Sequence, residues 1–410
     1  MKKYYPLSTV FHINSKGHEE EYQNRINQLS AYHTDIEITP INKGDFSNEK
    51  VPLFLVNIPN LAELNEEIIE NSRTITLLKN QLPTVSQEDF YSKLLINEIQ
   101  STNEVENVRS TKKEISEILE EIKHKKVNQN NSVKKRFLGL TKLYYFLGQD
   151  SDITKVEDIR TIYDELVDPE IDDEDKLDGE MFRKESVSVD SGGREIHRGV
   201  MSESKIISML SQMISFLRNG KMPYLYKLML SHYLFEYIHP FYDGNGRMGR
   251  YMVCKFLSKK LDRYSAVTFS YIINRHKNKY YNAFSQTSHP LNKGEATFFV
   301  KDMLEMIVEG QKQVIAILEK DIQKINRIEF NIDNIIKKEF DKSVIFVMAQ
   351  SAVFQPKSQR ISVNDLATVH DCERRKIMNT LDNYKNKIEI IKKRPSIYTL
   401  TDEFLDELLS

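Results

Sequence analysis

Residues 223–261 form two predicted helices joined by a short polar loop that neither helix can extend through. Pro240 ends the first helix, and Gly244 and Gly246 allow backbone conformations that other residues avoid. The second helix then begins directly after these glycines, with its first backbone amides unpaired. Apolar residues recur at helical spacing on both sides of the loop, at Leu225, Leu228, Met229, Tyr233, Leu234 and Ile238 and again at Met252, Val253, Phe256, Leu257 and Leu261. Any fold of this chain must therefore accommodate a helix, a tight glycine turn and a second helix N-terminus.

The loop and the second helix carry the features of an anion site. Free amides and the helix dipole favour a negative charge at the helix N-terminus. Gly244 and Gly246 let the backbone approach a phosphate closely. Arg247 and Arg250 lie three residues apart, hence on one helix face, and each can bind phosphate oxygens through two N–H groups. The pattern indicates a site for a phosphorylated ligand.

Two further side chains add chemistry to this site. His239 has an ordinary pKa of about 6.5, so its imidazole can accept a proton near neutral pH. Asp243 can supply one carboxylate oxygen to Mg²⁺, which usually binds one or two protein carboxylates together with phosphates and water. Each feature alone is more often structural: a His before Pro, a solvated Arg pair or a simple turn. Their combination carries the hypothesis.

Residues 239–250, His-Pro-Phe-Tyr-Asp-Gly-Asn-Gly-Arg-Met-Gly-Arg, match the signature of the Fic family, H-x-F-x-(D/E)-G-N-G-R-x-x-R, at every specified position. This resemblance implies a mainly α fold, in which a helical core carries a small β-hairpin flap. It also implies an enzyme that transfers AMP from ATP to a Ser, Thr or Tyr hydroxyl of a protein and releases pyrophosphate. Fic proteins often modify themselves, and rarer members transfer other phosphate-containing groups, so that alternative stays open.

The resemblance also assigns roles by position. His239 corresponds to the general base, Asp243 to the ligand of the Mg²⁺ cofactor, and Asn245 to the residue that holds the attacked phosphate. Tyr280 and Tyr281 resemble the tyrosine pair that flanks adenine in relatives, although aromatic core packing would explain them equally well. The remaining roles are the phosphate cradle (Gly244, Gly246 and Arg247), the partner of the terminal phosphate (Arg250) and a core anchor (Phe241).

A second motif concerns regulation. Thr102, Glu106 and Asn107 fit the inhibitory-helix pattern of the family, (S/T)-x-x-x-E-(G/N), on a predicted helix near 95–107. A Glu106 carboxylate paired with Arg250 would occupy the guanidinium that the terminal phosphate of ATP needs. The alternative is that Glu106 is an ordinary surface acid.

Alternating residues on both sides of Gly192 and Gly193 predict a β-hairpin. Fic proteins carry a flap at this place, and it binds an extended segment of the target by strand pairing. Val187, Ser188 and Val189 would then be the target-docking residues. A small exposed hairpin without this role is the alternative.

The chain of 410 residues is long enough for several domains. We predict an N-terminal extension (1–90) with a strand at 51–56 and a helix near 61–80, a catalytic core (91–310), a linker helix (311–340) and a winged-helix-like domain (341–410). Within the core, the acidic run at 164–175 is predicted to be a solvated loop rather than a metal site.

The C-terminal section provides a second function class. Two short helices followed by a predicted hairpin at 388–400 resemble a winged helix. Its basic residues could contact DNA phosphates, although interleaved acids favour a protein-docking or dimer role equally. They are Arg374, Arg375, Lys376, Lys392, Lys393 and Arg394. The alternative function is therefore a DNA-binding regulator that uses the Fic core as a nucleotide sensor.

Composition limits the remaining possibilities. The formal net charge of −2 gives no global attraction to nucleic acid or membranes. Cys254 and Cys372 lie far apart in the sequence, which favours reduced thiols and a cytoplasmic location over a disulfide framework. No long apolar run predicts a membrane span. Homodimer formation is left open as a further alternative.

Overall fold

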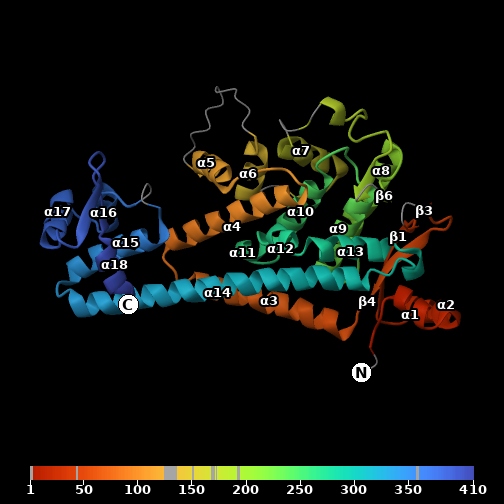
Figure 1. Ribbon diagram of the computed structural model, residues 1–410, viewed down its shortest axis with the longest axis horizontal. Helices are drawn as coiled ribbons and strands as arrows, with labels where there is room; N and C mark the ends of the chain where they lie inside the picture. The colour runs from red at the N-terminus through yellow and green to blue at the C-terminus, as the bar shows by residue number, and fades with distance from the viewer. Residues whose placement is uncertain are drawn as a thin grey trace. The chain divides into compact units, whose positions relative to one another are not determined.

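The computed structural model of the protein describes residues 3–42, 45–123, 136–149, 152–167, 171, 173–191, 194–356 and 360–410. The chain is mainly helical with small two-stranded antiparallel sheets (Figure 1), which confirms the predicted fold class. It divides into two compact units. The first contains residues 1–72 and 95–312, and the second contains residues 73–94 and 313–410. Three helices contribute residues to both units: α3 (Pro59–Lys79), α4 (Thr84–Val105) and α14 (Thr297–Ile335).

The first unit is built around α9 (Tyr224–Ile238), whose residues are buried on nearly every side. It packs against α8 (Glu203–Asn219) and α10 (Asn245–Leu257). A helix that is apolar all round is buried by its neighbours, which makes α9 a fixed support for whatever follows it. The other helices of this unit are α5 (Lys112–Lys123), α6 (Leu138–Tyr145), α7 (Val156–Val167), α11 (Arg263–Ala266), α12 (Phe269–Arg275) and α13 (Lys277–Ser288).

The predicted helix, glycine turn and helix are confirmed. α9 ends at Ile238, and His239 after it has a left-handed backbone with φ 52°. Gly244, with φ 80°, precedes the first residue of α10. Asn and Gly tolerate such angles more readily than His does, so His239 is held in a conformation that its surroundings must stabilise.

The N-terminal segment belongs to the same unit as the helical core. It contains α1 (Leu7–Ile13), α2 (His18–Ile26), β1 (Ala31–Ile38) and β4 (Val51–Val56), and β4 is the strand predicted at 51–56. β1 and β4 pair in antiparallel fashion, and Phe54 forms a parallel bridge with Glu295 just before α14. The shorter elements here and nearby are η1 (Ser15–Gly17), β2 (Ile41–Asn42), β3 (Asp45–Phe46), η2 (Asp173–Asp175) and η3 (Pro290–Asn292).

The predicted hairpin is present as β5 (Ser188–Ser191) and β6 (Arg194–Arg198). Ser188 pairs with Arg198 and Val189 with His197. The expected turn residues Gly192 and Gly193 lie outside the described residues, as do residues 168–170 and 172 of the acidic run.

The second unit ends in a small module with its own core. The module contains α15 (Glu339–Phe354), α16 (Val363–Val369), α17 (Arg374–Asn383), β7 (Ile388–Lys392), β8 (Ile397–Leu400) and α18 (Asp402–Leu409). β7 and β8 form the hairpin predicted at 388–400, and Ser362 bridges to Ile397 as a further short strand pairing. The predicted helix cap is also present, because the backbone N–H of Asp365 donates to Ser362 Oγ at 3.2 Å. Buried residues of this core include Val344, Ile345, Leu366, Ile377 and Leu381.

The linker helix differs in extent from the prediction. The linker helix predicted at 311–340 is part of α14, which begins at Thr297 and ends at Ile335, before α15 begins at Glu339. Among the described residues, no helix is long and apolar enough to cross a membrane.

Candidate functional site

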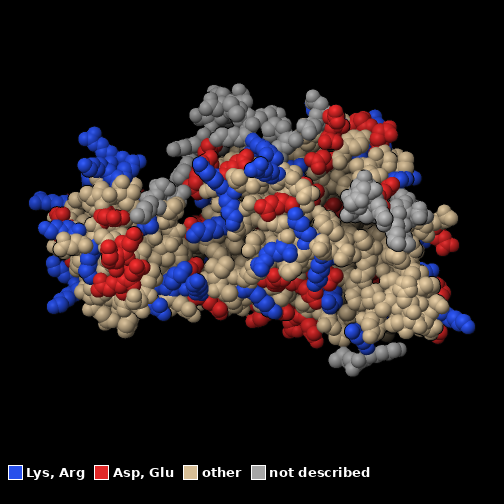
Figure 2. All heavy atoms as spheres, in the orientation of Figure 1, with Lys and Arg blue, Asp and Glu red and all other residues tan. Residues whose placement is uncertain are grey.

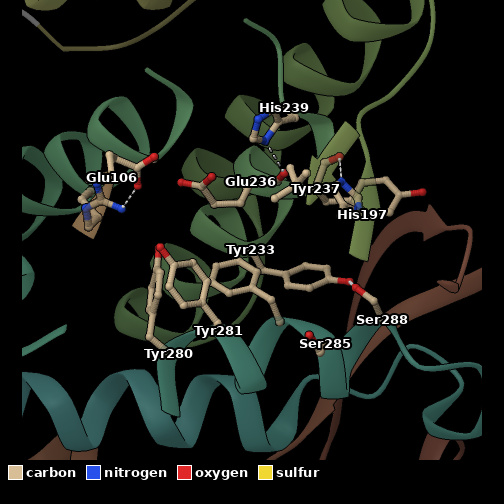
Figure 3. A pocket seen from close by; sticks show the side chains of 14 residues that line it. Glu106, His197, Tyr233, Glu236, Tyr237, His239, Tyr280, Tyr281, Ser285 and Ser288 are labelled. Carbon is tan, nitrogen blue, oxygen red and sulfur yellow. Dashed lines mark hydrogen bonds and ion pairs between the residues drawn. The ribbon is translucent and has the colours of Figure 1, made fainter. Parts of the chain in front are cut away.

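A pocket of about 160 Å³ lies in the first unit, where the end of α9 meets the start of α10. Figure 3 shows that α13 forms its aromatic side, while Glu106 and the hairpin residue His197 lie at opposite ends. Helices α9, α10 and α13, the hairpin β5–β6 and Glu106, directly after α4, all contribute to the wall. The lining residues are Glu106, Val189, His197, Tyr233, Glu236, Tyr237, His239, Gly246, Arg250, Tyr280, Tyr281, Phe284, Ser285 and Ser288.

His239 presents a neutral imidazole to this pocket. Burial, and then the nearby His197 and Arg183, lower the pKa of His239 to about 3. Its Nδ1 lies 3.4 Å from the carbonyl oxygen of Glu236, which favours a proton on Nδ1 and leaves Nε2 able to accept one. The residue can therefore act as a proton acceptor at neutral pH.

The loop between the two helices is closed by its own side chains. Asn245 Oδ1 accepts from the backbone N–H of Phe241 at 3.0 Å, and Asn245 Nδ2 donates to the Phe241 carbonyl at 2.8 Å. The Phe241 ring stacks on Tyr163 with centroids 3.5 Å apart. Tyr163 in turn donates to the carbonyl of Asp243 at 3.0 Å. In this structure Asn245 thus holds the loop, whereas the resemblance places it at the phosphate, and Phe241 is the expected core anchor.

Asp243 and Arg247 form an ion pair at the entrance to α10. Arg247 Nη2 lies 3.0 Å from Asp243 Oδ2, and the side chains are 2% and 49% exposed, respectively. The carboxylate is thus the accessible partner. Among the described residues, no group of three or more His, Cys, Asp or Glu side chains could hold a metal ion alone. The single exposed carboxylate fits Mg²⁺, which completes its shell with phosphate oxygens and water.

Arg250 is buried and binds Thr102 on α4 and Glu106 directly after that helix. Its Nε donates to Thr102 Oγ1 at 3.0 Å, its Nη2 to the Thr102 carbonyl at 3.0 Å, and its Nη1 to Glu106 Oε1 at 2.9 Å. Burial would lower the pKa of Arg250, but Glu106 and the weaker effects of Tyr280, Glu236 and Tyr281 together outweigh burial and raise that pKa. The Arg side chain is 1% exposed and that of Glu106 27%. The contact expected between Glu106 and Arg250 is therefore present.

Asn107 lies in the turn that follows α4, next to Glu106. It has a left-handed backbone with φ 58°, and the N–H of Val108 returns to the Asn103 carbonyl at 2.8 Å. Asn tolerates this conformation better than most residues, which explains its type at this position.

The tyrosines proposed for adenine binding both line the pocket but differ in exposure. Tyr280 is 2% exposed, and its hydroxyl is bonded to His232 Nε2 at 2.9 Å. Tyr281 is 41% exposed and donates to the carbonyl of Val105 at 3.2 Å. Tyr281 therefore offers an accessible ring face, and Tyr280 supports it from the core.

Glu236 is a site residue that the sequence reasoning missed. It lies three residues before His239 and hence one turn away on the same helix face, which is the signal that could have indicated it. Its Oε1 is buried and has no hydrogen-bond partner among the described residues. Burial raises the pKa of Glu236 to about 8. Nearby Arg250 lowers that pKa and Glu106 raises it, and both effects are smaller than that of burial. The carboxyl is therefore largely protonated at neutral pH.

The hairpin is fixed beside His239 by a second histidine that the sequence reasoning did not identify. His197 Nε2 is bonded to the carbonyl of Tyr237 at 2.8 Å, and the His197 and His239 rings lie 6.5 Å apart (Figure 3). Of the proposed docking residues, Val189 lines the pocket, Val187 is partly buried and Ser188 is exposed. The hairpin thus presents residues to both the pocket and solvent.

Comparison with known proteins agrees with this geometry. Residues 153–257 match the model of the Fic/DOC family, so the chain carries a Fic/DOC family domain. A Fic family protein from Desulfovibrio desulfuricans G20 superposes with a TM-score of 0.54 at 20% identity, covering 84% of this chain and 97% of that one. This likeness shows a common fold.

Two further structures are similar over a smaller share of this chain. A form of Fic-1 from C. elegans has a TM-score of 0.40 at 16% identity, covering 60% of this chain and 71% of that one. A Fic domain containing signaling protein from Bacteroides thetaiotaomicron has a TM-score of 0.43 at 16% identity, covering 61% of this chain and 98% of that one.

Proposed function

We propose, from the premise that residues 153–257 form a Fic/DOC family domain, that this chain transfers AMP from ATP to a Ser, Thr or Tyr hydroxyl of a protein, itself included. The supporting observation is that one pocket combines a neutral His239 with the N-terminus of α10 and the Arg250 guanidinium. Phosphoryl-type transfer needs positioning and charge neutralisation more than covalent help from the enzyme.

In this proposal His239 accepts the proton of the incoming hydroxyl. The hydroxyl oxygen then bonds to the α-phosphorus of ATP, the bond to the bridging oxygen breaks, and pyrophosphate leaves with that electron pair. The first amides of α10 and the guanidinium of Arg247 stabilise the charge on the phosphates. Mg²⁺ bound at Asp243 would supply further neutralisation of the phosphate oxygens. The hairpin strand containing Val189 would align the target segment beside His239.

We also propose that Glu106 inhibits this reaction. Glu106 accepts the Nη1 hydrogen bond of Arg250, while Thr102 accepts those of Nε and Nη2. Only the contact with Glu106 must therefore break to free Nη1 for a terminal phosphate. Gly in place of Glu106 should leave Arg250 correctly oriented. The expected result is an increase in self-modification.

Intact mass spectrometry tests the reaction. Wild type, Glu106→Gly and Glu106→Gly/His239→Ala are incubated with Mg²⁺ and ATP. Adenylyl additions in Glu106→Gly alone would support the reaction, the base and the inhibitory contact together. Unchanged masses in every variant, with ATP still bound and added target proteins also unmodified, would refute AMP transfer. Repeating the assay with GTP, CTP and UTP tests the alternative of another transferred group.

A second candidate function, duplex DNA binding by the winged-helix-like module, has one specific observation in its favour. Arg374 Nη2 donates to Ser396 Oγ at 3.2 Å, which brings the start of α17 against the β7–β8 turn. Arg375, Lys376 and residues 392–394 are exposed. Figure 2 shows basic side chains gathered over α17 and this hairpin, whereas α18 contributes Asp402, Glu403, Asp406 and Glu407.

Fluorescence anisotropy with a labelled duplex tests this candidate. Replacing Arg375, Lys393 and Arg394 with Ala should weaken binding and reduce its dependence on salt, because fewer counterions are released. Replacing Lys320, Lys337 and Lys338 with Ala removes the same charge elsewhere in the unit and should have little effect. His239→Ala should leave binding unchanged. Equal losses in both triple variants would contradict a specific surface.

A further inference from the structure

Arg183 is a fully buried guanidinium at the junction between the hairpin and α9. Its Nε donates to the carbonyl of His239 at 2.8 Å, and its Nη2 donates to those of Val200 at 2.9 Å and Ile238 at 3.3 Å. Its Nη1 donates to the carbonyl of Glu185 at 2.6 Å. Four of its five N–H groups thus bind backbone carbonyls, and the acceptors come from three separate segments.

Two of these acceptors are the carbonyl of Ile238, the last residue of α9, and that of His239 after it. The final carbonyls of a helix have no partner within the helix, and a cation there also interacts favourably with the helix dipole. Arg183 therefore supplies the C-terminal cap for the helix that presents His239. This cap also explains how a non-glycine residue keeps the left-handed conformation seen at His239.

The other two acceptors flank the hairpin. Glu185 precedes β5 and Val200 follows β6, so one side chain bridges the entry and exit of the flap. The backbone N–H of Val200 also donates to the Ile238 carbonyl at 3.0 Å. The hairpin base and the end of α9 thus form one hydrogen-bonded junction.

The backbone of Gly199 lies close against the guanidinium. A Cβ added to Gly199 would clash with Nη2 of Arg183 and approach His239 Cβ to 3.0 Å. Within the described residues, Arg183 forms no ion pair with a carboxylate. Since a buried charge is costly without compensation, the four carbonyl contacts are what keep it there.

We propose that Arg183 is the positioning residue for the reaction, fixing His239 and the target-docking hairpin in one register. This inference rests on the proposed transferase function. An Arg at this position is required because its planar fork can satisfy carbonyls in several directions, whereas the ammonium of Lys is a point charge that cannot reach all four. Misplacing a base by about 1 Å can cost about 100-fold in rate.

Steady-state kinetics in the Glu106→Gly background tests the proposal. Arg183→Lys should lower kcat at least about tenfold and raise the KM for a protein or peptide target, with little change in the KM for ATP. Arg160→Lys is the matched control, because Arg160 also donates to a neighbouring backbone carbonyl, that of Met181 at 2.9 Å, but does not contact α9 or the hairpin. Wild-type kcat in Arg183→Lys would overturn the proposal. So would equal losses in kcat and in ATP affinity.

A readout without catalysis separates this inference from the transferase proposal. Amide hydrogen exchange of Arg183→Lys should increase in residues 185–200 and 236–243, and remain unchanged in residues 98–106. That pattern would support the junction even if no variant transferred AMP. Exchange that increases everywhere, or nowhere, would refute it.

Gly199→Ala provides an independent perturbation in case Arg183 variants fold poorly. The added methyl displaces the guanidinium but leaves its charge and length intact. The same kcat loss and the same local exchange pattern are expected, and the two substitutions together should cost less than the sum of each. Full additivity would show that Gly199 acts independently of Arg183 and would count against the proposal.

Discussion

At the residue scale, the unpartnered carboxyl of Glu236 predicts an unusual pH dependence of stability. Its folded pKa of about 8 lies above the ordinary value of 4.5. The folded state therefore holds a proton that the unfolded state releases, and the stabilisation is complete below about pH 4.5 and lost as pH rises through 8. Glu236→Gln should remove this loss, so the variant should gain stability relative to wild type as pH rises.

Chemical denaturation at several pH values measures this effect. The stability difference should change by up to about 1.4 kcal/mol per pH unit between pH 5 and 8. Glu329→Gln, at an exposed position on α14, controls for removal of one acid. A difference between Glu236→Gln and wild type that stays constant with pH would contradict the buried, protonated carboxyl.

Thr102 carries a second residue-scale prediction, because it orients Arg250 independently of Glu106. Its hydroxyl and carbonyl each accept one N–H of Arg250 at 3.0 Å. In the Glu106→Gly background, Thr102→Val removes the hydroxyl acceptor and should raise the KM for ATP about fivefold, equivalent to about 1 kcal/mol for one hydrogen bond. Thr102→Ser should restore the wild-type KM in the same steady-state assay. A Thr102→Val variant with unchanged KM would show that the Arg250 orientation does not depend on this hydroxyl.

The site residues that the sequence could predict differ from the others in how far apart along the chain their partners lie. His239, Asp243 and Arg250 are close in sequence and share one helix–loop–helix, so their spacing predicts their proximity. Thr102 and Glu106 lie about 150 residues away, and only the resemblance connected them to Arg250. The spacing of Glu236 from His239 is local, but its raised pKa depends on tertiary burial, and the role of Arg183 depends on tertiary hydrogen bonds.

At the element scale, α4, whose last residue directly precedes Glu106, is anchored by a buried acid. Glu98 lies two turns earlier on α4 and accepts from the N–H groups of Ser270 at 2.8 Å and Tyr271 at 3.0 Å, at the start of α12. Cys254 Sγ also donates to Glu98 at 3.3 Å. Glu98 therefore caps α12 and fixes α4 at the same time.

Glu98→Gln should loosen this attachment. An amide has one acceptor oxygen and brings two N–H groups that need partners, so we expect a loss of about 1–3 kcal/mol in unfolding free energy. Self-modification by an otherwise wild-type chain should rise, because Glu106 is held less firmly. Calorimetry and the intact-mass assay measure the two effects. A stable variant with unchanged labelling would show that α4 is anchored elsewhere.

Element boundaries were predictable where the chain marks them chemically. Pro240 marks the end of α9 and Gly244 marks the start of α10. β4 coincides with the apolar run at 51–56. The predicted boundary at residue 310 has no such mark. Gly310 lies there, but a single glycine did not end the helix, and α14 continues through it. A continuous helix there is consistent with the modest cost of one glycine in a packed helix.

At the scale of the whole molecule, a buried ion pair helps to attach the N-terminal segment to the rest of the first unit. Arg25 Nη1 lies 2.9 Å from Glu295 Oε2, and the two side chains are 4% and 2% exposed. Tyr4 also donates to Glu295 Oε1 at 2.6 Å. Residues almost 300 positions apart thus meet beside the Phe54–Glu295 bridge. The predicted N-terminal extension (1–90) did not indicate this contact, since composition does not show which charges become paired.

Glu295→Ala should destabilise the chain by up to about 3–5 kcal/mol, because it removes the buried partner of Arg25 and leaves only the partly exposed Glu21, at 2.8 Å, to pair with the buried guanidinium. The matched control is Glu309→Ala, which removes an ion pair with His276 whose side chains are 41% and 40% exposed and should cost at most about 1 kcal/mol. Arg25→Met combined with Glu295→Ala should recover part of the loss, since the buried guanidinium is then absent and only the partly exposed Glu21 loses a partner. Denaturant unfolding of the four chains measures these differences. If Glu295→Ala cost no more than Glu309→Ala, the N-terminal segment would not depend on this pair for its place in the unit.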